Sequence, residues 1–448
     1  MREILVTTEE FKDSPVGKIP KDWDCLSIKD CLIKGLIVDV QDGNHGEAHP
    51  KSEDFVTEGI PFVMAKDLVN RQINLADCNK ISWKQYKSLR VGFAQSGDVL
   101  LSHKGTIGLT AIVPSWLHDV MLTPQVTYYR IAEGKQLLNI FIFWFFNSPI
   151  FQQKLQILSA QSTRSYIGIT LQKTLLIFIP PVNEQQKIAE ILDAIDKAIA
   201  LTDTHITKLK KAKAGLLHDL LTRGIDEHGE LRDYTRNPEL FKRSLLGIIP
   251  KDWDYVKVAD IANDVTDGDH HTPKRTDSGI FLLSARNILH GKLALKDVDF
   301  VPEYEYERMI RRCYPESGDI LISCSGTIGR VCEVPYNFKC VLVRSAALIK
   351  LNTNKCFSNF IEATLQSNIV QSQILVQQLQ AAQPNLFQGA IKCLIFPLPS
   401  MKEQKRIAKS LIKFNSQISS KETRLEKLKL LKKGLMSDLL TGRVRVKI

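Results

Sequence analysis

Two stretches of the chain carry the same repeating pattern of apolar positions. Residues 184–222 and 403–441 align without a gap at an offset of 219, and apolar residues recur in both at alternating steps of four and three. This 3.5-residue spacing is typical of a helix that keeps one face against a partner helix. Neither stretch contains proline, so each is predicted as one helix, about 60 Å long at 1.5 Å per residue.

The predicted seam has seven positions in each helix. In the first helix they are Ile188, Leu192, Ile195, Ile199, Thr202, Ile206 and Leu209. In the second they are Ile407, Leu411, Phe414, Ile418, Lys421, Leu425 and Leu428. Such helices either pack separately into cores or pack on each other as a spacer; the matched lengths and phases favour the spacer.

The duplication extends beyond the helices. FKDSPVGKIPKDWD at 11–24 returns as FKRSLLGIIPKDWD at 241–254, and SGDVLLSHKGTIG at 96–108 returns as SGDILISCSGTIG at 317–329. DGNHG at 42–46 has its counterpart in DGDHH at 267–271. The chain therefore consists of two copies of a unit of about 220 residues, each a globular part followed by a long helix. Between the matched segments the copies differ strongly, which suggests one scaffold used on two targets.

The globular parts are predicted to be mixed α/β. The apolar runs Asp98–Ser102 and Asp319–Ser323 end in Gly-Thr-Ile-Gly, a pattern typical of a strand entering a tight turn. The apolar stretches 137–158 and 357–380 are predicted as helices. The expected order is a first domain at 1–182, a helix at 183–222, a connector at 223–246, a second domain at 247–399, and a helix with a tail at 400–448.

Composition indicates the kind of partner and the cellular compartment. The formal net charge is +11 with a pI near 9.1, an excess that favours a polyanionic partner such as nucleic acid. Nine scattered cysteines without a CxxC pair indicate reduced thiols and a cytoplasmic protein. The N-terminal residues lack the apolar core of a signal peptide, and LLNIFIFWFF at 137–146 is too short to span a bilayer. No membrane association is expected.

The motifs of nucleic-acid enzymes are missing. The chain has no GxxxxGK[ST] loop for a triphosphate and no NPP[YF] or DPP[YF] tetrapeptide of an adenine methyltransferase. The GTIG segments lack the GxGxxG spacing of a dinucleotide site. The nearest approach to a metal cluster is Asp267-Gly-Asp269-His270-His271, whose spacing does not match a helical zinc pair and favours a polar turn. No metal and no cofactor are predicted for this chain.

What remains is binding through the loops that differ between the copies. Arginine and lysine side chains can bind guanine or phosphate, and asparagine and glutamine can pair with adenine. Each such residue taken alone is better explained as a solvated loop residue, and only the recurrence of these sets at equivalent turns favours binding. The DNA-binding candidates are His45, Lys51, His103, Lys104, Thr106, Gln161, Ser162, Thr163 and Arg164 in the first copy, and His270, His271, Lys274, Arg275, Arg286, Asn287, Ser325, Thr327, Arg330, Arg344 and Gln383 in the second.

The assembled pattern resembles the specificity subunit of type I restriction-modification enzymes. The resemblance covers essentially the whole chain and depends on the FK/IPKDW openings, the EQQKIA and EQKRIA helix starts, the SGDxLxSxxGTIG segments and the terminal LLTGRVRV. It implies that each globular part is a target recognition domain that reads one half of a bipartite site in double-stranded DNA. It also implies that the two helices pair as an antiparallel coiled coil with pseudo-two-fold symmetry and set the spacer between the half-sites.

The same resemblance implies partners. Two modification subunits would carry S-adenosylmethionine and methylate adenine, and restriction subunits would supply the ATP- and Mg-dependent translocase and nuclease. The helix ends are predicted to dock the modification subunits through Leu216, Leu217, Leu220, Leu221, Leu435, Leu439 and Leu440. Packing of these leucines against the partner helix is the alternative.

Two other functions remain open from the residues. An enzyme with unrecognised motifs would methylate or cleave DNA without partners. A tandem coiled-coil adaptor would show no salt-dependent binding to DNA duplexes. The basic excess and the polar variable loops argue against the adaptor, and the missing motifs argue against the enzyme.

Overall fold

The duplicated SGDxLxS segments form the central strands of two similar domains. In the computed structural model, which describes residues 5–7, 10–46, 49–134, 136–160, 165–380 and 385–447, these strands are β12 (Val99–Ser102) and β25 (Ile320–Ser323). Every residue of both strands is buried. Val99 and Leu101 enter one hydrophobic core and Leu100 enters another, so the strand is covered on both faces. Burial on both faces explains why its sequence is continuously apolar instead of alternating.

The chain forms two units. Unit 1 comprises Met1–Asp203 with Thr423–Ile448, and unit 2 comprises Thr204–Glu422. Each long helix is divided between them: α6 (Val182–Thr222) and α12 (Met401–Leu439) contribute one half to each unit. The two predicted long helices are therefore confirmed to within two residues of their expected ends.

Both units contain the same antiparallel four-stranded sheet. In unit 1 its order is β13-β12-β15-β5, and in unit 2 it is β26-β25-β28-β20. The bounds of the flanking strands are β5 (Ile37–Asp42), β13 (Thr110–Ile112), β15 (Val126–Ile131), β20 (Ala262–Asp267), β26 (Val331–Glu333) and β28 (Ala346–Leu351).

Each unit has a second sheet, of five strands in unit 1 and three in unit 2, that contains one parallel pair. In unit 1 the pair is β7 (Ile60–Val63) with β14 (Val120–Leu122), and in unit 2 it is β21 (Ile280–Leu283) with β27 (Cys340–Leu342). The remaining strands of these sheets are β6 (Phe55–Val56), β10 (Lys80–Ile81), β11 (Phe93–Ala94) and β24 (Asp299–Val301). The expected mixed α/β class and the duplication are both confirmed.

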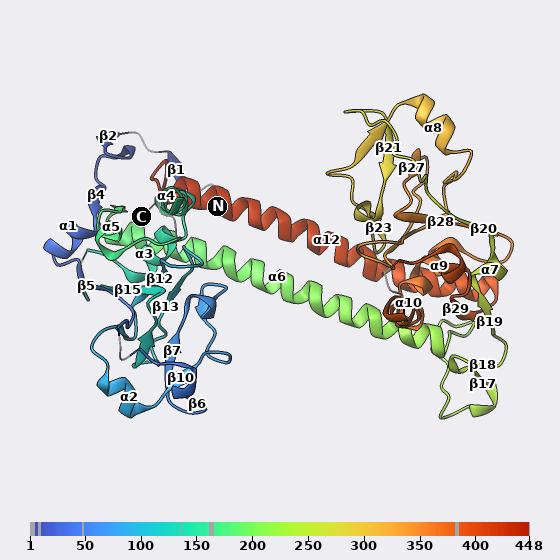
Figure 1. Ribbon diagram of the computed structural model, residues 1–448, viewed down its shortest axis with the longest axis horizontal. Helices are drawn as coiled ribbons and strands as arrows, with labels where there is room; N and C mark the ends of the chain where they lie inside the picture. Colours follow the sequence, from blue (N-terminus) through green and yellow to red (C-terminus); the bar gives the residue numbers. More distant parts are fainter. Residues whose placement is uncertain are drawn as a thin grey trace. The chain divides into compact units, whose positions relative to one another are not determined.

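Helices cover one face of each four-stranded sheet (Figure 1). The two apolar stretches predicted as single helices are each broken in two, giving α3 (Asn139–Phe146) and α4 (Pro149–Ala160) in unit 1 and α9 (Ser358–Leu365) and α10 (Asn368–Gln380) in unit 2. Phe141–Phe146 are all buried, so the apolar run of α3 is a core helix. None of the helices among the described residues has the length and apolarity needed to cross a membrane.

In each unit the halves of α6 and α12 run antiparallel. In unit 1 Glu184 pairs with Arg445 and Asp196 pairs with Lys432, so the partner number falls as α6 advances. Ile188, Leu192 and Ile195 of α6 share a core there with Leu435, Leu439 and Leu440, and the end of α12 lies beside the start of α6 (Figure 1). In unit 2 Lys210 Nζ lies 2.7 Å from Glu422 of α12, and the backbone N–H of Ile225, just past α6, donates to Glu403 at 2.9 Å.

The predicted seam positions are buried or partly buried. Ile206, Ile418, Leu425 and Thr202 are buried, and Leu209, Phe414 and Lys421 are partly exposed. Ile407 and Leu411 pack in the core of unit 2 with Leu217, Leu220 and Leu221, whereas Ile199 and Leu428 pack against the core of unit 1. The 3.5-residue pattern thus identified the packed face of both helices.

Candidate nucleic-acid interface

The duplicated DG turn closes the end of a strand in each unit. Asp42 is the last residue of β5 and Asp267 the last of β20, and Gly43 and Gly268 come directly after them. A Cβ atom on Gly43 would lie 2.0 Å from the carbonyl oxygen of Thr123, and one on Gly268 would lie 2.3 Å from the backbone of Leu342. Only glycine lets the loop pass this close to the neighbouring strand, and this close approach explains why the DG pair recurs.

The GTIG turn follows the central strand in each unit. Gly105 and Gly108 have φ of +75° and +91°, a region that favours glycine. Ser102 Oγ accepts the N–H of Leu109 at 2.8 Å, and Ser323 Oγ accepts the N–H of Arg330 at 2.9 Å, so the strand-ending serine braces the turn in both units. Thr106 and Thr327 at the turn tips are exposed.

The DG and GTIG turns lie side by side. In unit 1 the Asp42 carboxylate lies 3.5 Å from His103 Nε2 at the start of the GTIG turn. In unit 2 the backbone N–H of Arg344 donates to the carbonyl of Asp269 at 3.0 Å, and the N–H of Cys324 donates to the carbonyl of Ser345 at 2.8 Å. The DG turn, the GTIG turn and the β27–β28 loop therefore meet at one edge of unit 2.

Most predicted DNA-binding residues that the structure describes are exposed near these loops. They are His45, Lys51, Lys104 and Thr106 in unit 1 and His270, His271, Lys274, Arg275, Arg286, Thr327 and Arg344 in unit 2, with Ser325 and Arg330 partly exposed. Gln161, Ser162, Thr163, Arg164 and Gln383 lie outside the described residues.

Two of the predicted DNA-binding residues are buried, so that prediction is wrong for them. His103 is 1% exposed, and its Nδ1 lies 3.1 Å from the carbonyl of Ile167. Asn287 is 2% exposed; its Oδ1 accepts the N–H of Ser284 at 2.9 Å and its Nδ2 donates to Ala294 at 3.1 Å. Both side chains hold loops in place and cannot face a duplex in this conformation.

The leucines predicted to dock partner subunits lie inside their own units. Leu217, Leu220 and Leu221 belong to the core of unit 2, against which Leu216 packs. Leu435, Leu439 and Leu440 belong to the core of unit 1. These six leucines are buried, which favours the alternative of packing, whereas Leu216 is partly exposed. The GLLHDLLT and GLMSDLLT motifs recur because each closes a core.

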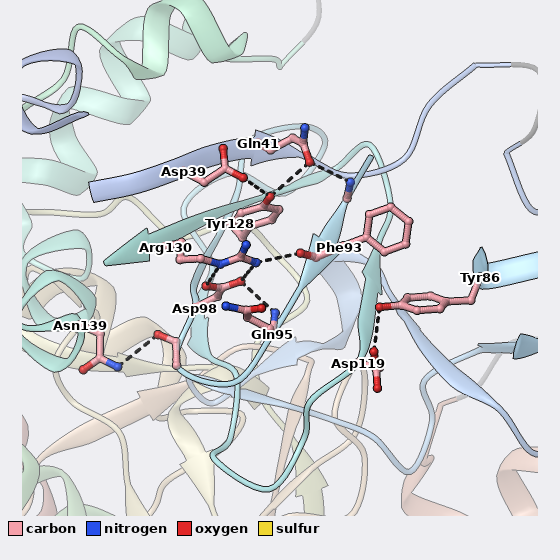
Figure 2. A network of polar contacts seen from close by, with 12 residues as sticks. Asp39, Gln41, Tyr86, Phe93, Gln95, Asp98, Asp119, Tyr128, Arg130 and Asn139 are labelled. Carbon is pink, nitrogen blue, oxygen red and sulfur yellow. Dashed lines mark hydrogen bonds and ion pairs between the residues drawn. The ribbon is translucent and has the colours of Figure 1, made fainter. Parts of the chain in front are cut away.

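A buried polar network crosses the sheet of unit 1 (Figure 2). Arg130 donates to the Asp98 carboxylate at 3.0 and 2.8 Å and to the carbonyl of Phe93 at 2.9 Å. Burial raises the pKa of Asp98, and the hydrogen bonds from Arg130 oppose that rise. A cleft of about 730 Å³ opens beside this pair. Lys350 and Asp319 form the same contact at 3.2 Å in unit 2, so the pair belongs to the shared scaffold.

Three arginines of this region are not among the residues predicted from the sequence. Arg308, Arg311 and Arg312 lie at the end of α8 (Glu303–Met309) and line a pocket with the DG turn of unit 2. The run RMIRR was the available signal, but its place beside DGDHH depends on a contact between segments about 40 residues apart. Among the described residues no group of three His, Cys, Asp or Glu side chains could hold a metal ion. Asp267 is instead bonded to Arg312, His270 and Gln388.

Comparison with known proteins identifies the class. Residues 20–211 and 250–430 match the family model of the type I restriction modification DNA specificity domain, once for each copy. The chain belongs to this family. It is 24% identical to the type I restriction enzyme MjaVIII specificity subunit of Methanocaldococcus jannaschii, over 98% of this chain and 97% of that protein.

Another relative and a solved structure are also specificity subunits of type I systems. The EcoBI specificity subunit of Escherichia coli is 24% identical over 86% of this chain and 79% of its own. The crystal structure of the S subunit of the type I restriction-modification system from M. genitalium has the same fold, with a TM-score of 0.56 at 16% identity, over 93% of this chain and 96% of that chain.

Proposed function

We propose that this chain is the non-catalytic DNA-recognition subunit of a type I restriction-modification complex. The observation that carries the proposal is the double match to the specificity-domain family on two units with the same fold. Residues 1–182 and 247–399 act as target recognition domains, and each reads one half of a bipartite site in double-stranded DNA. The variable loops around the DG and GTIG turns supply the contacts to bases and phosphates.

The helices at 183–222 and 400–439 set the spacer between the half-sites, and 223–246 connects the copies. Antiparallel pairing in each unit supports this role, because two similar readers related by a two-fold axis face a duplex as a dimer does. A spacing of whole helical turns then keeps both readers on one face of the DNA.

The chain works with partners that supply the chemistry. Two modification subunits bind it and use S-adenosylmethionine, and restriction subunits use ATP and Mg²⁺. The cytoplasm is the compartment that fits a DNA partner and nine free cysteines.

The test is methylome sequencing of cells that carry this chain with its modification subunit, compared with cells that lack this chain. Adenine methylation at a split motif, lost on deletion, is the expected result. If the complex is soluble and its modification subunit is active, but no split motif is methylated, the result would favour the tandem coiled-coil adaptor. Methylation or cleavage by the purified chain alone would favour the enzyme.

A further inference from the structure

Unit 2 contains an arginine-lined pocket next to its DG turn. The pocket has a volume of about 370 Å³ and lies between Asp269, His270 and His271 on one side and the end of α8 on the other. Arg308, Arg311 and Arg312 all line it. These three guanidinium groups do not have the same surroundings, and the difference indicates what the pocket binds.

Two of the arginines are held by carboxylates. Arg308 Nη2 lies 2.6 Å from Asp269 and 2.8 Å from Glu305. Arg312 Nη2 lies 2.7 Å from Asp267, and its Nε donates to the carbonyl of Gly268 at 3.3 Å. The two acids of the DGD sequence therefore fix Arg308 of α8 and Arg312, just past it, against the turn.

The acids that hold these arginines are ionised at neutral pH. Burial by itself would raise the pKa of Asp267, but hydrogen bonds from Arg312, His270 and Gln388 outweigh burial and lower it. Asp269 behaves alike: burial acts to raise its pKa, and the hydrogen bond from Arg308 brings it below the ordinary value. Arg308 and Arg312 are therefore neutralised in place and have little freedom to move toward a ligand.

Arg311 differs from its neighbours. Its side chain is exposed at the pocket, and it makes no hydrogen bond or ion pair with another residue in the described part of the chain. A guanidinium group carries a planar fork of donors that suits two acceptors side by side. Arg311 is the arginine of this pocket that is available to a ligand.

The residues at the equivalent place in unit 1 differ. Asn44 replaces Asp269, and Asp42 accepts a hydrogen bond from Thr127 at 2.5 Å instead of binding an arginine. Counted from the aligned SGD segments, Lys87 stands in place of Arg308 and Val91 in place of Arg312, whereas the exposed Arg90, just past α2 (Trp83–Ser88), is the counterpart of Arg311. The two arginines bound to the DG turn are thus specific to unit 2, whereas an exposed arginine at the position of Arg311 is present in both copies.

The charges of the pocket favour a base over a phosphate. Asp269 and Glu305 neutralise Arg308 and Asp267 neutralises Arg312, so the sum of these three arginines and three acids is zero, and the Asp269 carboxylate at the pocket opposes entry of a phosphate. A guanine edge is uncharged and presents two acceptors, O6 and N7, which a single arginine binds in bidentate fashion. We propose that Arg311 reads a guanine in the half-site recognised by unit 2, with Arg308 and Arg312 shaping the pocket. This inference rests on the proposed function.

The test uses the full chain with its modification subunits and compares Arg311→Ala with Arg243→Ala, a matched loss of one exposed arginine in the same unit. Methylome sequencing gives the base preference at every position of both half-sites. Arg311→Ala is expected to lower the preference for one G·C pair about ten- to hundredfold in one half-site and to leave the other half-site and the spacer unchanged. Arg243→Ala should reproduce the wild-type motif.

A second variant keeps a side chain that forms hydrogen bonds. Glutamine pairs with adenine N6 and N7, so Arg311→Gln is expected to move the preference at the same position from guanine toward adenine. This change of preference requires contact with the base and would not follow from a general loss of folding.

Other outcomes would overturn the inference. A wild-type bipartite motif that stays unchanged in both Arg311 variants would exclude the contact. A uniform loss of binding on all sequences, with a shallower salt dependence, would indicate a phosphate contact instead. Absence of any split motif with the wild-type chain would instead contradict the proposed function itself, so the two failures are distinguishable.

Discussion

The indole N–H of Trp23 donates to the carboxylate of Glu184 at 2.9 Å, across 161 positions of the chain. Trp253 makes the same bond to Glu403 at 3.0 Å in the other unit. Both glutamates are buried, and each also binds an arginine: Arg445 at 2.6 Å and Arg232 at 3.0 Å. The IPKDW and EQ motifs recur together because they meet in this contact.

In each contact the glutamate lies at the start of one long helix, and the arginine lies just past the end of the other long helix. Arg445 follows α12 but binds Glu184 in unit 1, and Arg232 follows α6 but binds Glu403 in unit 2. Arg445→Ala is therefore expected to destabilise unit 1 by about 3 kcal/mol, because the buried Glu184 loses its charged partner.

Hydrogen exchange of the full chain checks this prediction unit by unit. Arg445→Ala should raise exchange around Trp23 and in the first half of α6, and Arg232→Ala should raise it around Trp253 and in the first half of α12. Equal effects of both variants on both units would contradict the assignment.

Much of this fold is predictable from the sequence, and the limits have physical causes. A 3.5-residue period identifies a packed helix face directly, and continuous apolar runs such as VLLS identify strands covered on both sides. Contacts between distant segments leave no such pattern. The sequence around His103 has the composition of an exposed turn, yet the ring is buried against Ile167.

The sequence predicts which loops form the candidate site, but it does not predict which side chains of those loops are exposed. Duplicated glycines locate the DG and GTIG turns because the backbone requires them. Which polar side chain faces outward depends on tertiary contacts, as Asn287 illustrates by capping its own loop. The recurring leucines of the DLLT motifs could be read as a surface or as a core, and burial decides for the core.

Truncation of the helix seam should cost stability where the seam is buried. Leu192 is fully buried between α6 and the core of unit 1, whereas Leu201 on the same helix is 61% exposed. Leu192→Ala is expected to lower the free energy of unfolding by about 3 kcal/mol, from lost apolar burial and the cavity left behind. Leu201→Ala should change it by less than about 0.5 kcal/mol. Urea denaturation measures the free energy of unfolding of the two variants. Equal losses in both would contradict the prediction that the buried seam positions stabilise the unit.

The length of the helices should set the recognised spacer. Duplicating TDTH at 202–205 adds four residues to α6, about 6 Å at 1.5 Å per residue. This length is close to two base-pair steps of about 3.4 Å. Methylome sequencing is expected to return both half-sites unchanged with a longer spacer. An unchanged spacer in an active complex would contradict the prediction that helix length sets the spacer.

Stability of unit 1 should fall as the pH drops below neutral. Burial lowers the pKa of His103 below its ordinary value, and the nearby Asp42 only partly opposes this effect. The unfolded chain takes up a proton near pH 6.5 that the folded ring resists. The stability that unit 1 gains from a neutral His103 is therefore fully present above about pH 6.5. It is lost as the pH falls from there through the lower pKa of the folded state.

Denaturation of His103→Gln at several pH values between 7.5 and 5 measures this contribution. The variant should show a shallower fall in unfolding free energy than the wild type, by at most about 1.4 kcal/mol per pH unit. His45→Gln, at an exposed position, should keep the wild-type slope. A His103→Gln slope equal to that of the wild type would contradict the prediction.

The central claim is that each unit reads its own half of the target on an equivalent scaffold. The most direct measurement is the methylome of a chain in which residues 250–398 are replaced by residues 20–179, so that both units carry the first recognition domain. Methylation is expected at an inverted repeat of one wild-type half-site with the wild-type spacer. Persistence of the original bipartite motif would contradict it, as would loss of all methylation in a chain that still folds and binds its modification subunits.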